Sequence, residues 1–299
     1  MDRTHAYDEI VERATRARGV TMLVGGLDTG KSTLARRIVR AGLEAGVRGA
    51  VLDADIGQSS VGPPATVGLK LVREPADLEP DALARADALA FVGTTSPQGH
   101  LLPLVSGSRL LLDRARAEGA ELVVVDTTGL VSGVFGQVLK FHKIGLLRPD
   151  LVVGLERGEE LEPLLGVIRR FYPAEVVALP VSAEVTATSV ERRAVLREES
   201  MRRYFAEPLQ RWRVKPTVFM PALPDLFDLS VLDRILVGLS DGKGLCIGIG
   251  YLEFLSGEGA LRLISPVSEA PKALILGSVR LEEGYRARRV DLRNLLGSD

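Results

Sequence analysis

Cysteine, aromatic residues and long apolar runs are scarce in this 299-residue chain. The single cysteine, Cys246, excludes an intrachain disulfide framework and a cysteine-based zinc site, so we expect a buried thiol that packs as a small apolar group. Aromatic residues make up 5% of the chain, and the one tryptophan, Trp212, is expected to pack rather than to stack on a base. No run approaches the roughly 18 apolar residues of a membrane span, and the polar N-terminus is unlike a secretory signal. We therefore expect a soluble, cytoplasmic protein.

An excess of positive charge is also missing. The chain has 38 basic and 39 acidic residues, which gives a formal net charge of -1. Such a chain has no overall positive field that would attract nucleic acid. A polynucleotide ligand would have to be held by a local basic patch. The hydrophobic fraction of 46% is sufficient for a substantial core.

Apolar runs without polar alternation recur through the first two thirds of the chain, which is typical of strands buried on both faces. Helical patterns separate these runs, and strands that alternate with helices predict a parallel α/β sheet flanked by helices. We therefore expect residues 1–213 to form one α/β domain. The runs lie at residues 20–26, 49–55, 88–95, 120–129, 149–156 and 174–181.

The pattern changes after residue 213. The apolar runs become short, glycine-rich turns separate them, and no long helical pattern follows, so residues 214–299 are predicted to form a small β-rich domain. No Gly/Ser linker separates the two parts. We expect them to pack as one folded unit.

A phosphate-binding loop lies between the first predicted strand and the first helix that follows it. The stretch GGLDTGKS fits G-x-x-x-x-G-K-[ST], in which glycines let the backbone and the helix N-terminus approach phosphates. Lys31 is expected to reach the β- and γ-phosphates, Ser32 to ligate Mg²⁺ and Thr33 to contact the α-phosphate. The late strands lack the guanine-reading N-K-x-D, which favours ATP over GTP. The candidate nucleotide-binding residues are Gly25, Gly26, Leu27, Asp28, Thr29, Gly30, Lys31, Ser32 and Thr33.

Acidic side chains follow two further predicted strands, where they would lie in the ligand crevice. Asp55 is a candidate base or magnesium contact, and Gln58 could grip a phosphate on the acceptor side. Asp126 follows an apolar strand at the position that usually supports Mg²⁺ in phosphate-loop proteins. The alternatives without a catalytic role are a solvated loop acid for Asp55 and a turn or helix cap for Asp126.

Several motifs, taken in order, resemble the Clp/Grc group of P-loop polynucleotide 5′-hydroxyl kinases. They are GGLDTGKST, DADIGQ, GTTSPQGH, VVVDTTGLVSG, LVGLSDGKGLCIGIG and LILGSVRL, and the resemblance covers about residues 20–285. It implies a P-loop kinase-type sheet that moves the γ-phosphate of ATP to the 5′-OH end of RNA or DNA. It also implies Asp55 as base and magnesium contact, and Gln58 as a ligand of the substrate phosphate.

The resemblance further implies a substrate clasp, T-x-G-W, at Thr127, Thr128 and Gly129. Leu130 replaces the tryptophan, so this position offers apolar contact but no ring on which a base could stack. The phosphate loop begins at residue 25, so we expect the large N-terminal β domain of eukaryotic members to be absent. Other segments are expected to form the adenine pocket.

An arginine-rich helix is predicted at about 189–206. Arg193 and Arg197 lie four residues apart with no acid at helical spacing, whereas Arg202 and Arg203 each follow a glutamate by four residues and are expected to pair with it. The resemblance places the R-x-x-x-R lid of the family on Arg193 and Arg197, as cations over the transferring phosphate. The alternative is a solvated helix face.

Polar residues of two other segments are weaker candidates. Ser96 and His100 lie on the loop after the strand at 88–95, where acceptor contacts could form, although a lone histidine is more often structural. Lys140, His142 and Lys143 belong either to an acceptor channel or to a polar helix face.

Three functions remain open from sequence. The first is a polynucleotide 5′-kinase that uses ATP and Mg²⁺. The second is a non-catalytic ATP-binding scaffold of an RNA-processing complex. The third is a kinase of a small hydroxylated metabolite.

Overall fold

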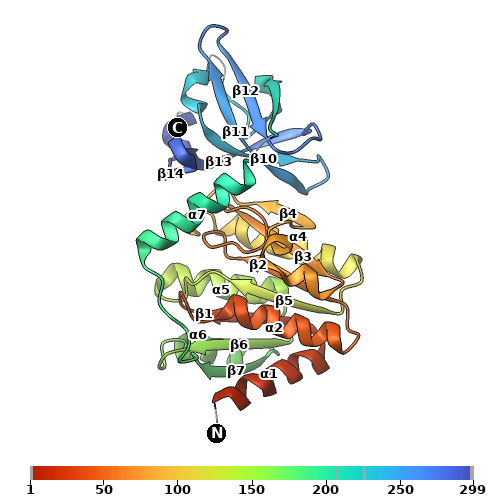
Figure 1. Cartoon of the computed structure of the whole chain (residues 1–299). Coiled ribbons are helices and arrows are strands. Elements are labelled where there is room, and N and C mark those ends of the chain that lie inside the picture. Colours follow the sequence, from red (N-terminus) through yellow and green to blue (C-terminus); the bar gives the residue numbers. More distant parts are fainter. Residues whose placement is uncertain (1–2, 207, 225–226, 297–299) are drawn as a thin grey trace.

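The computed structural model describes residues 3–206, 208–224 and 227–296. Figure 1 shows an elongated molecule with an α/β part at one end, a β-rich part at the other and helix α7 (Val190–Tyr204) running up to their junction. One 14-stranded mixed sheet runs through both parts. Eleven of these strands follow the order β14-β13-β10-β11-β4-β3-β2-β5-β1-β6-β7, and off this path β12 pairs with β11 and β8, and β9 pairs with β13. Among the described residues, none of the helices is both long and apolar enough to span a membrane.

Five neighbouring strands of the α/β part are parallel, as predicted. Their carboxyl ends therefore meet at one edge of the sheet, where Asp53 is the register partner of Asp126. These strands are β2 (Gly49–Ala54), β5 (Leu122–Thr127), β1 (Gly19–Gly25), β6 (Leu151–Glu156) and β7 (Glu175–Pro180).

Two further strands make the sheet mixed. β3 (Thr66–Val72) pairs antiparallel with β2, and β4 (Ala88–Phe91) pairs antiparallel with β3. The sequence analysis predicted no strand between 49–55 and 88–95, and β3 is the strand that it missed. β3 escaped prediction because Lys70 interrupts its apolar run; the lysine is buried and lies 3.4 Å from a carboxylate oxygen of Asp77.

Helices cover both faces of the parallel strands. One face buries apolar residues of α1 (Arg3–Ala17) and α2 (Lys31–Glu44). It also buries residues of a short helical turn (Pro75–Leu78) and of α3 (Pro80–Leu83). The other face buries residues of α4 (Leu101–Ala117), α5 (Gly133–Leu147) and α6 (Glu162–Phe171). This three-layer arrangement is the predicted α/β architecture.

The C-terminal part is β-rich, as predicted, and its sheet continues that of the α/β part. β11 meets β4 where Cys246 pairs with Leu89, and the thiol is buried there. The boundary predicted at residue 213 falls near the end of β8, whose partner β12 lies in the C-terminal sheet. The elements are β8 (Gln210–Val214), β9 (Phe219–Met220), β10 (Ile235–Ser240), β11 (Cys246–Leu255), β12 (Ala260–Ser265), β13 (Ala273–Leu281), β14 (Ala287–Arg289) and α8 (Leu292–Leu296).

Candidate active site

The phosphate loop joins β1 to α2 and has the geometry that its sequence predicts. Gly30 stands before α2 with a φ of 86°, in the left-handed region that favours glycine. A Cβ on Gly25 would lie 2.7 Å from the Leu155 carbonyl oxygen, so only glycine fits there. The Lys31 Nζ donates hydrogen bonds to the carbonyl oxygens of Gly25 and Gly26, at 3.0 and 2.6 Å. The ammonium is thus held inside the loop, where phosphate oxygens would bind.

An arginine that the sequence did not single out also supports this loop. The Arg157 guanidinium donates to the carbonyl oxygens of Leu27 and Asp28. Arg157 immediately follows β6, so its place at the carboxyl end of a parallel strand was a signal that could have found it. Thr29 is buried and Leu27 is exposed, while Thr33 faces the cleft from the first turn of α2.

Ser32 and Asp126 form the candidate magnesium site. The Ser32 hydroxyl donates to Asp126 Oδ2 at 2.5 Å, and Asp126 Oδ1 is buried without a hydrogen-bond partner. Burial raises the pKa of Asp126, while Lys31 and the Ser32 hydroxyl act in the opposite direction. A hydroxyl beside a carboxylate with a free oxygen matches the oxygen ligands that Mg²⁺ prefers. In the described part of the chain no three His, Cys, Asp or Glu side chains form a metal site by themselves, so phosphate oxygens would complete the shell.

The two aspartates after β2 have different surroundings. Asp53 is fully buried, and its carboxylate accepts bonds from the amides of Asp55, Ser60 and Val61, which shape the following loop. Asp55 lines the cleft, and only its Oδ1 is engaged, accepting from the amides of Gly57 and Gln58. Asp55 is therefore the carboxylate that can meet a ligand.

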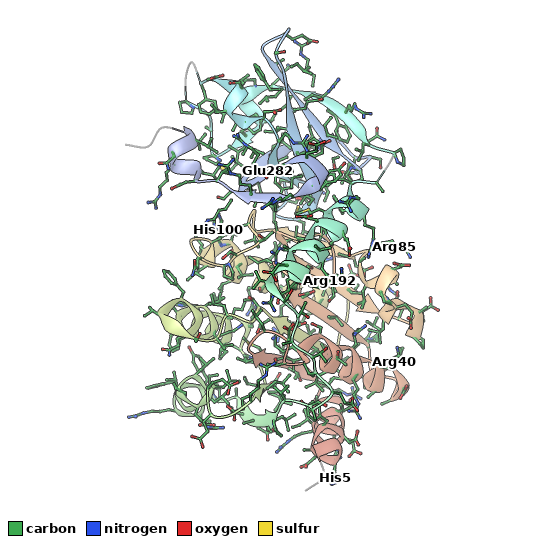
Figure 2. All side chains as sticks on the ribbon, turned by 60° about the vertical axis from the view of Figure 1, so that its left-hand side comes forward. His5, Arg40, Arg85, His100, Arg192 and Glu282 are labelled. Atoms are coloured by element: carbon green, nitrogen blue, oxygen red, sulfur yellow. The ribbon has the colours of Figure 1, made fainter. Side chains whose placement is uncertain are left out.

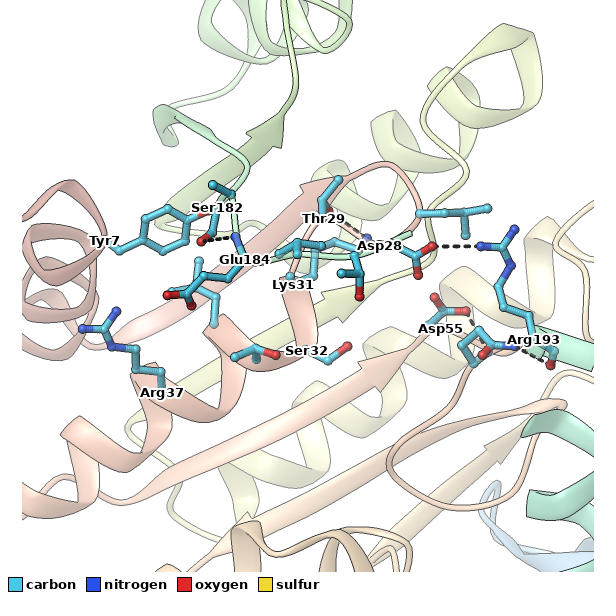
Figure 3. A pocket seen from close by; sticks show the side chains of 18 residues that line it. Tyr7, Asp28, Thr29, Lys31, Ser32, Arg37, Asp55, Ser182, Glu184 and Arg193 are labelled. Carbon is cyan, nitrogen blue, oxygen red and sulfur yellow. Dashed lines mark hydrogen bonds and ion pairs between the residues drawn. The ribbon is translucent and has the colours of Figure 1, made fainter. Parts of the chain in front are cut away.

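A cleft of about 750 Å³ connects these groups. Figure 3 shows Lys31, Ser32 and Asp55 around its middle, with Arg193 at one end and Tyr7 and Arg37 at the other. The Tyr7 end is also lined by the segment after β7, residues 182–186. The sequence did not locate this part of the cleft, since Tyr7 comes from a helix that precedes the phosphate loop.

The arginine-rich helix α7, which the resemblance makes a candidate lid, begins as predicted, with the Ser189 hydroxyl accepting from the Arg192 amide at 3.1 Å. Arg193, however, is not unpartnered. Its guanidinium lies 3.0 Å from Asp28 Oδ2 and donates to the Thr188 carbonyl at 2.7 Å, while Asp28 Oδ2 also accepts from the Thr188 amide. The expectation failed because the partner comes from the phosphate loop, 165 residues away.

The other arginines of α7 also differ from expectation. No hydrogen bond or ion pair joins the Arg197 side chain to any described residue, and burial together with the Arg193 charge lowers its pKa. The predicted i,i+4 pairs of Arg202 and Arg203 do not form among the described residues. Arg202 donates to the Gly284 carbonyl instead, and Glu199 lies 3.7 Å from Arg192. Arg202 has thus gained a tertiary partner, while Glu199 pairs within the helix with an arginine seven residues before it.

The predicted clasp packs against the phosphate loop. A Cβ on Gly129 would lie 2.6 Å from the Leu27 side chain, so the two loops touch. The Thr127 hydroxyl is buried and fully engaged, donating to the Leu23 carbonyl and accepting from Lys140 at 2.7 Å. Thr128 is also buried, and its carbonyl accepts from Lys140, while Gly129 is half-buried.

Two lysines of α5 lie beneath this clasp. Lys140 and Lys143 are fully buried, so they do not form a polar helix face. Lys140 Nζ donates to Thr127 Oγ1 and, at 2.6 Å, to the Thr128 carbonyl. Lys143 Nζ has no hydrogen-bond partner, and burial lowers its pKa to about 8 although Asp55, Asp53 and Asp126 act in the opposite direction.

The remaining candidates lie on the loop between β4 and α4. The His100 Nε2 lies 2.9 Å from the Ser278 hydroxyl of β13, so this side chain links the α/β part to the C-terminal part. Ser96 is half-buried, and its amide donates to the Thr94 hydroxyl. Gln58 lies between these groups and the lid, because its Nε2 donates to the Arg193 carbonyl at 3.1 Å. Acceptor contacts by Ser96 and His100 stay a prediction.

Comparison with known proteins gives consistent results. The model of the family described as mRNA cleavage and polyadenylation factor CLP1 P-loop matches residues 25–207. A polyribonucleotide 5′-hydroxyl-kinase of Thermococcus kodakarensis is 30% identical over 88% of each chain, and one of Pyrococcus furiosus is 28% identical over 94% of this chain and 92% of its own. A solved structure of a Clp1p–Pcf11p complex has the same fold, with a TM-score of 0.73 and 14% identity over 93% of this chain and 79% of that one.

Proposed function

This chain belongs to the CLP1 P-loop family, and on that premise we propose that it is an ATP-dependent polynucleotide 5′-hydroxyl kinase. One observation carries the proposal. The phosphate loop, Asp55 with Gln58, and the lid arginine Arg193 line a single cleft, although they come from three separate segments of the chain. RNA is the preferred acceptor class, because the relatives with the highest coverage are named polyribonucleotide 5′-hydroxyl-kinases.

ATP fits the cleft in one direction. Its phosphates bind around Lys31 in the middle of the cleft, where the loop amides and the α2 N-terminus favour anions. Its nucleoside then points toward Tyr7 and residues 182–186, the part of the cleft that contains an aromatic ring. The Tyr7 hydroxyl donates to the Pro180 carbonyl at 3.0 Å, which fixes the ring beside β7. These segments supply the adenine pocket that the sequence could not locate.

Mg²⁺ would be held by Ser32, Asp126 and oxygens of the bound phosphates, with Asp55 near enough in the same cleft to contact its water shell. When bound, the ion supplies positive charge to the β- and γ-phosphates. The unsatisfied Asp126 Oδ1 is the observation that supports this assignment.

The reaction is an in-line displacement at the γ-phosphorus. The acceptor 5′-oxygen forms the new P–O bond as the bond between the γ-phosphorus and the β–γ bridging oxygen breaks, and ADP leaves. Asp55 accepts the proton of the 5′-hydroxyl, while Lys31 and Arg197 stabilise the negative charge on the transferring group. Arg193 contributes through its ion pair with Asp28 of the phosphate loop. Positioning provides most of the acceleration in such transfers.

The acceptor end is proposed to meet Gln58, Thr128 and Gly129. Leu130 is partly buried against the core of the sheet, so it offers no aromatic platform. Base stacking at this position is thus replaced by apolar contact.

The direct test is transfer of labelled γ-phosphate from ATP, with Mg²⁺, to RNA and DNA oligonucleotides that carry a 5′-OH end. We expect end-labelling that depends on Lys31 and is absent with 5′-phosphorylated oligonucleotides. A folded, ATP-binding protein that labels neither polymer would exclude the kinase function. Labelling of a small hydroxylated metabolite alone would favour the metabolite kinase.

A further inference from the structure

A neutral protein needs a local basic surface to hold a polynucleotide, and the junction between the two parts of the molecule supplies one. A cavity of about 180 Å³ lies under α7, where the C-terminal part meets the loop after β4. Two of its walls carry arginines, Arg197 from α7 and Arg286 from the turn before β14. Figure 2 labels Arg192 on α7, with His100 and Glu282 on the two sides of this junction.

The two arginines share one property. Neither side chain has a hydrogen bond or ion pair with any described residue, whereas most arginines of the chain do. Glu198 is the one acidic side chain that lines the cavity. Both arginines line this one small cavity, and an anion bound in it would give both guanidinium groups a partner.

A third arginine extends the basic surface along β14. The Arg289 guanidinium donates to the Gln98 carbonyl at 3.2 Å, on the same loop as Ser96 and His100. Arg288 differs, because it lies 3.6 Å from the Glu282 carboxylate. Arg197, Arg286 and Arg289 therefore form a basic track from the lid across the C-terminal part.

The track begins close to the proposed reaction centre. Thr95, which lines the cavity, approaches the loop that follows Asp55: a Cβ on Gly57 would lie 2.9 Å from the Thr95 carbonyl oxygen. Arg197 also lines a second cavity, of about 320 Å³, together with Ser32 and Gln58. A strand whose 5′ end reaches Asp55 would thus pass the track with its first internucleotide phosphates.

The ring of Tyr285 forms an apolar wall of the same cavity. It stacks on Phe205 with ring centres 5.3 Å apart and planes at 4°, so it is held rigidly beside the arginines. Charged donors beside a fixed ring are the usual elements of a groove for single-stranded nucleic acid.

We propose that the C-terminal part is a working component of the acceptor site: the first internucleotide phosphates of a single-stranded acceptor bind between Arg197 of the lid and Arg286 of the C-terminal part. This inference rests on the proposed kinase function. It adds to that function a surface that binds only acceptors long enough to carry internucleotide phosphates. Arg286 is a binding residue here, and Arg197 contacts both the transferring phosphate and the strand.

The test compares Arg286→Ala and Arg286→Lys with wild type. Arg286 is exposed, so both variants should fold. We measure KM for a 5′-OH RNA decamer, KM for ATP, and decamer binding by fluorescence anisotropy over a salt series. The expected result for Arg286→Ala is a rise of about fivefold to twentyfold in decamer KM, with ATP KM unchanged, and a log–log salt slope shallower by about 0.7. Arg286→Lys should recover part of the loss.

Arg213→Ala is the matched control. Arg213 is an exposed arginine of β8 that pairs with Glu258 at 3.0 Å, away from the junction. Its decamer KM and salt slope should equal those of wild type. If Arg286→Ala binds and phosphorylates the decamer like wild type, or if Arg213→Ala loses as much, the track is refuted while the kinase function stands. If wild type labels no 5′ end, the kinase function itself fails.

Discussion

The two arginines of the proposed lid, Arg193 and Arg197, differ in whether the protein supplies a partner for their side chains. Arg193 is paired with Asp28 of the phosphate loop, while Arg197, one helical turn further, has no partner among the described residues and faces Arg286 across a cavity. On the proposed ATP side the protein itself holds the cation in place through Asp28. On the acceptor side positive charge is left unsatisfied, and this is the pattern expected where the missing partner is a ligand phosphate.

The largest effect should come from the phosphate loop. Lys31→Ala removes the ammonium that would meet the β- and γ-phosphates, so end-labelling should fall by about 10³-fold or more. Its hydrogen bonds go to the Gly25 and Gly26 carbonyls and the Thr29 hydroxyl of the same loop and not to the core, so the melting temperature should change by about 5 °C or less. Labelling rate and thermal melting check this, and a folded variant with normal activity would contradict it.

Next in size is the loss of the proposed base. Asp55→Asn keeps an oxygen that can accept from the Gly57 and Gln58 amides, so the loop should hold its shape. We expect kcat to drop by about 10²- to 10⁴-fold with little change in ATP affinity. Asp126→Asn is the companion variant: a greater kcat loss there would mean that the two carboxylates are assigned the wrong way round.

Alanine substitutions of the two lid arginines should have similar effects on turnover but different effects on stability. Arg197→Ala should lower turnover by about tenfold to a thousandfold, yet leave the melting temperature without nucleotide equal or slightly higher. Arg193→Ala should lower turnover too, but it also loses its bonds to Asp28 and Thr188 and should cost about 1–2 kcal/mol of stability. Arg192→Ala, on the exposed side of α7, is the control. Equal stability losses for both lid variants would remove the distinction between the two ends.

A further prediction concerns Lys143 and appears only with pH. Its folded pKa of about 8 lies below the ordinary 10.5, so between these values the unfolded chain binds more protons and stability rises with pH. Relative to Lys143→Met, wild type should gain about 2–3 kcal/mol between pH 7 and pH 10, at 1.36 kcal/mol per pKa unit. Urea unfolding of both proteins at several pH values measures this. A constant difference would show that the lysine does not titrate in that range.

The sequence was sufficient to predict site residues whose positions depend only on neighbouring segments of the chain. The phosphate loop, the lid helix and the residues that follow each parallel strand could be found because a strand, a turn and a helix in succession determine where they lie. The parallel strands were recognisable from their unbroken apolar runs. β3 was not predicted because it contains Lys70. A charged residue can be buried in a strand when the fold brings carboxylates next to it, and here Asp77 and Asp87 lie beside Lys70.

Partners from distant segments could not be predicted in this way. The Arg193 pair with Asp28 and the Lys140 bonds to the clasp join residues that only the tertiary fold brings together. For the same reason, helical spacing gave the wrong partner for Arg202, which donates to the Gly284 carbonyl. The basic track could not be found from sequence either, since Arg197 and Arg286 belong to different parts of the fold.

The difference between the two ends of the lid can be tested most directly by measuring KM for ATP and KM for 5′-OH RNA decamer side by side in Arg193→Ala and Arg286→Ala. The account predicts opposite patterns: Arg193→Ala should raise mainly the KM for ATP, because its partner belongs to the phosphate loop, and Arg286→Ala should raise only the KM for RNA. If both variants shift the same constant, or if Arg286→Ala shifts neither, the division of the site into an ATP side and an acceptor side is contradicted.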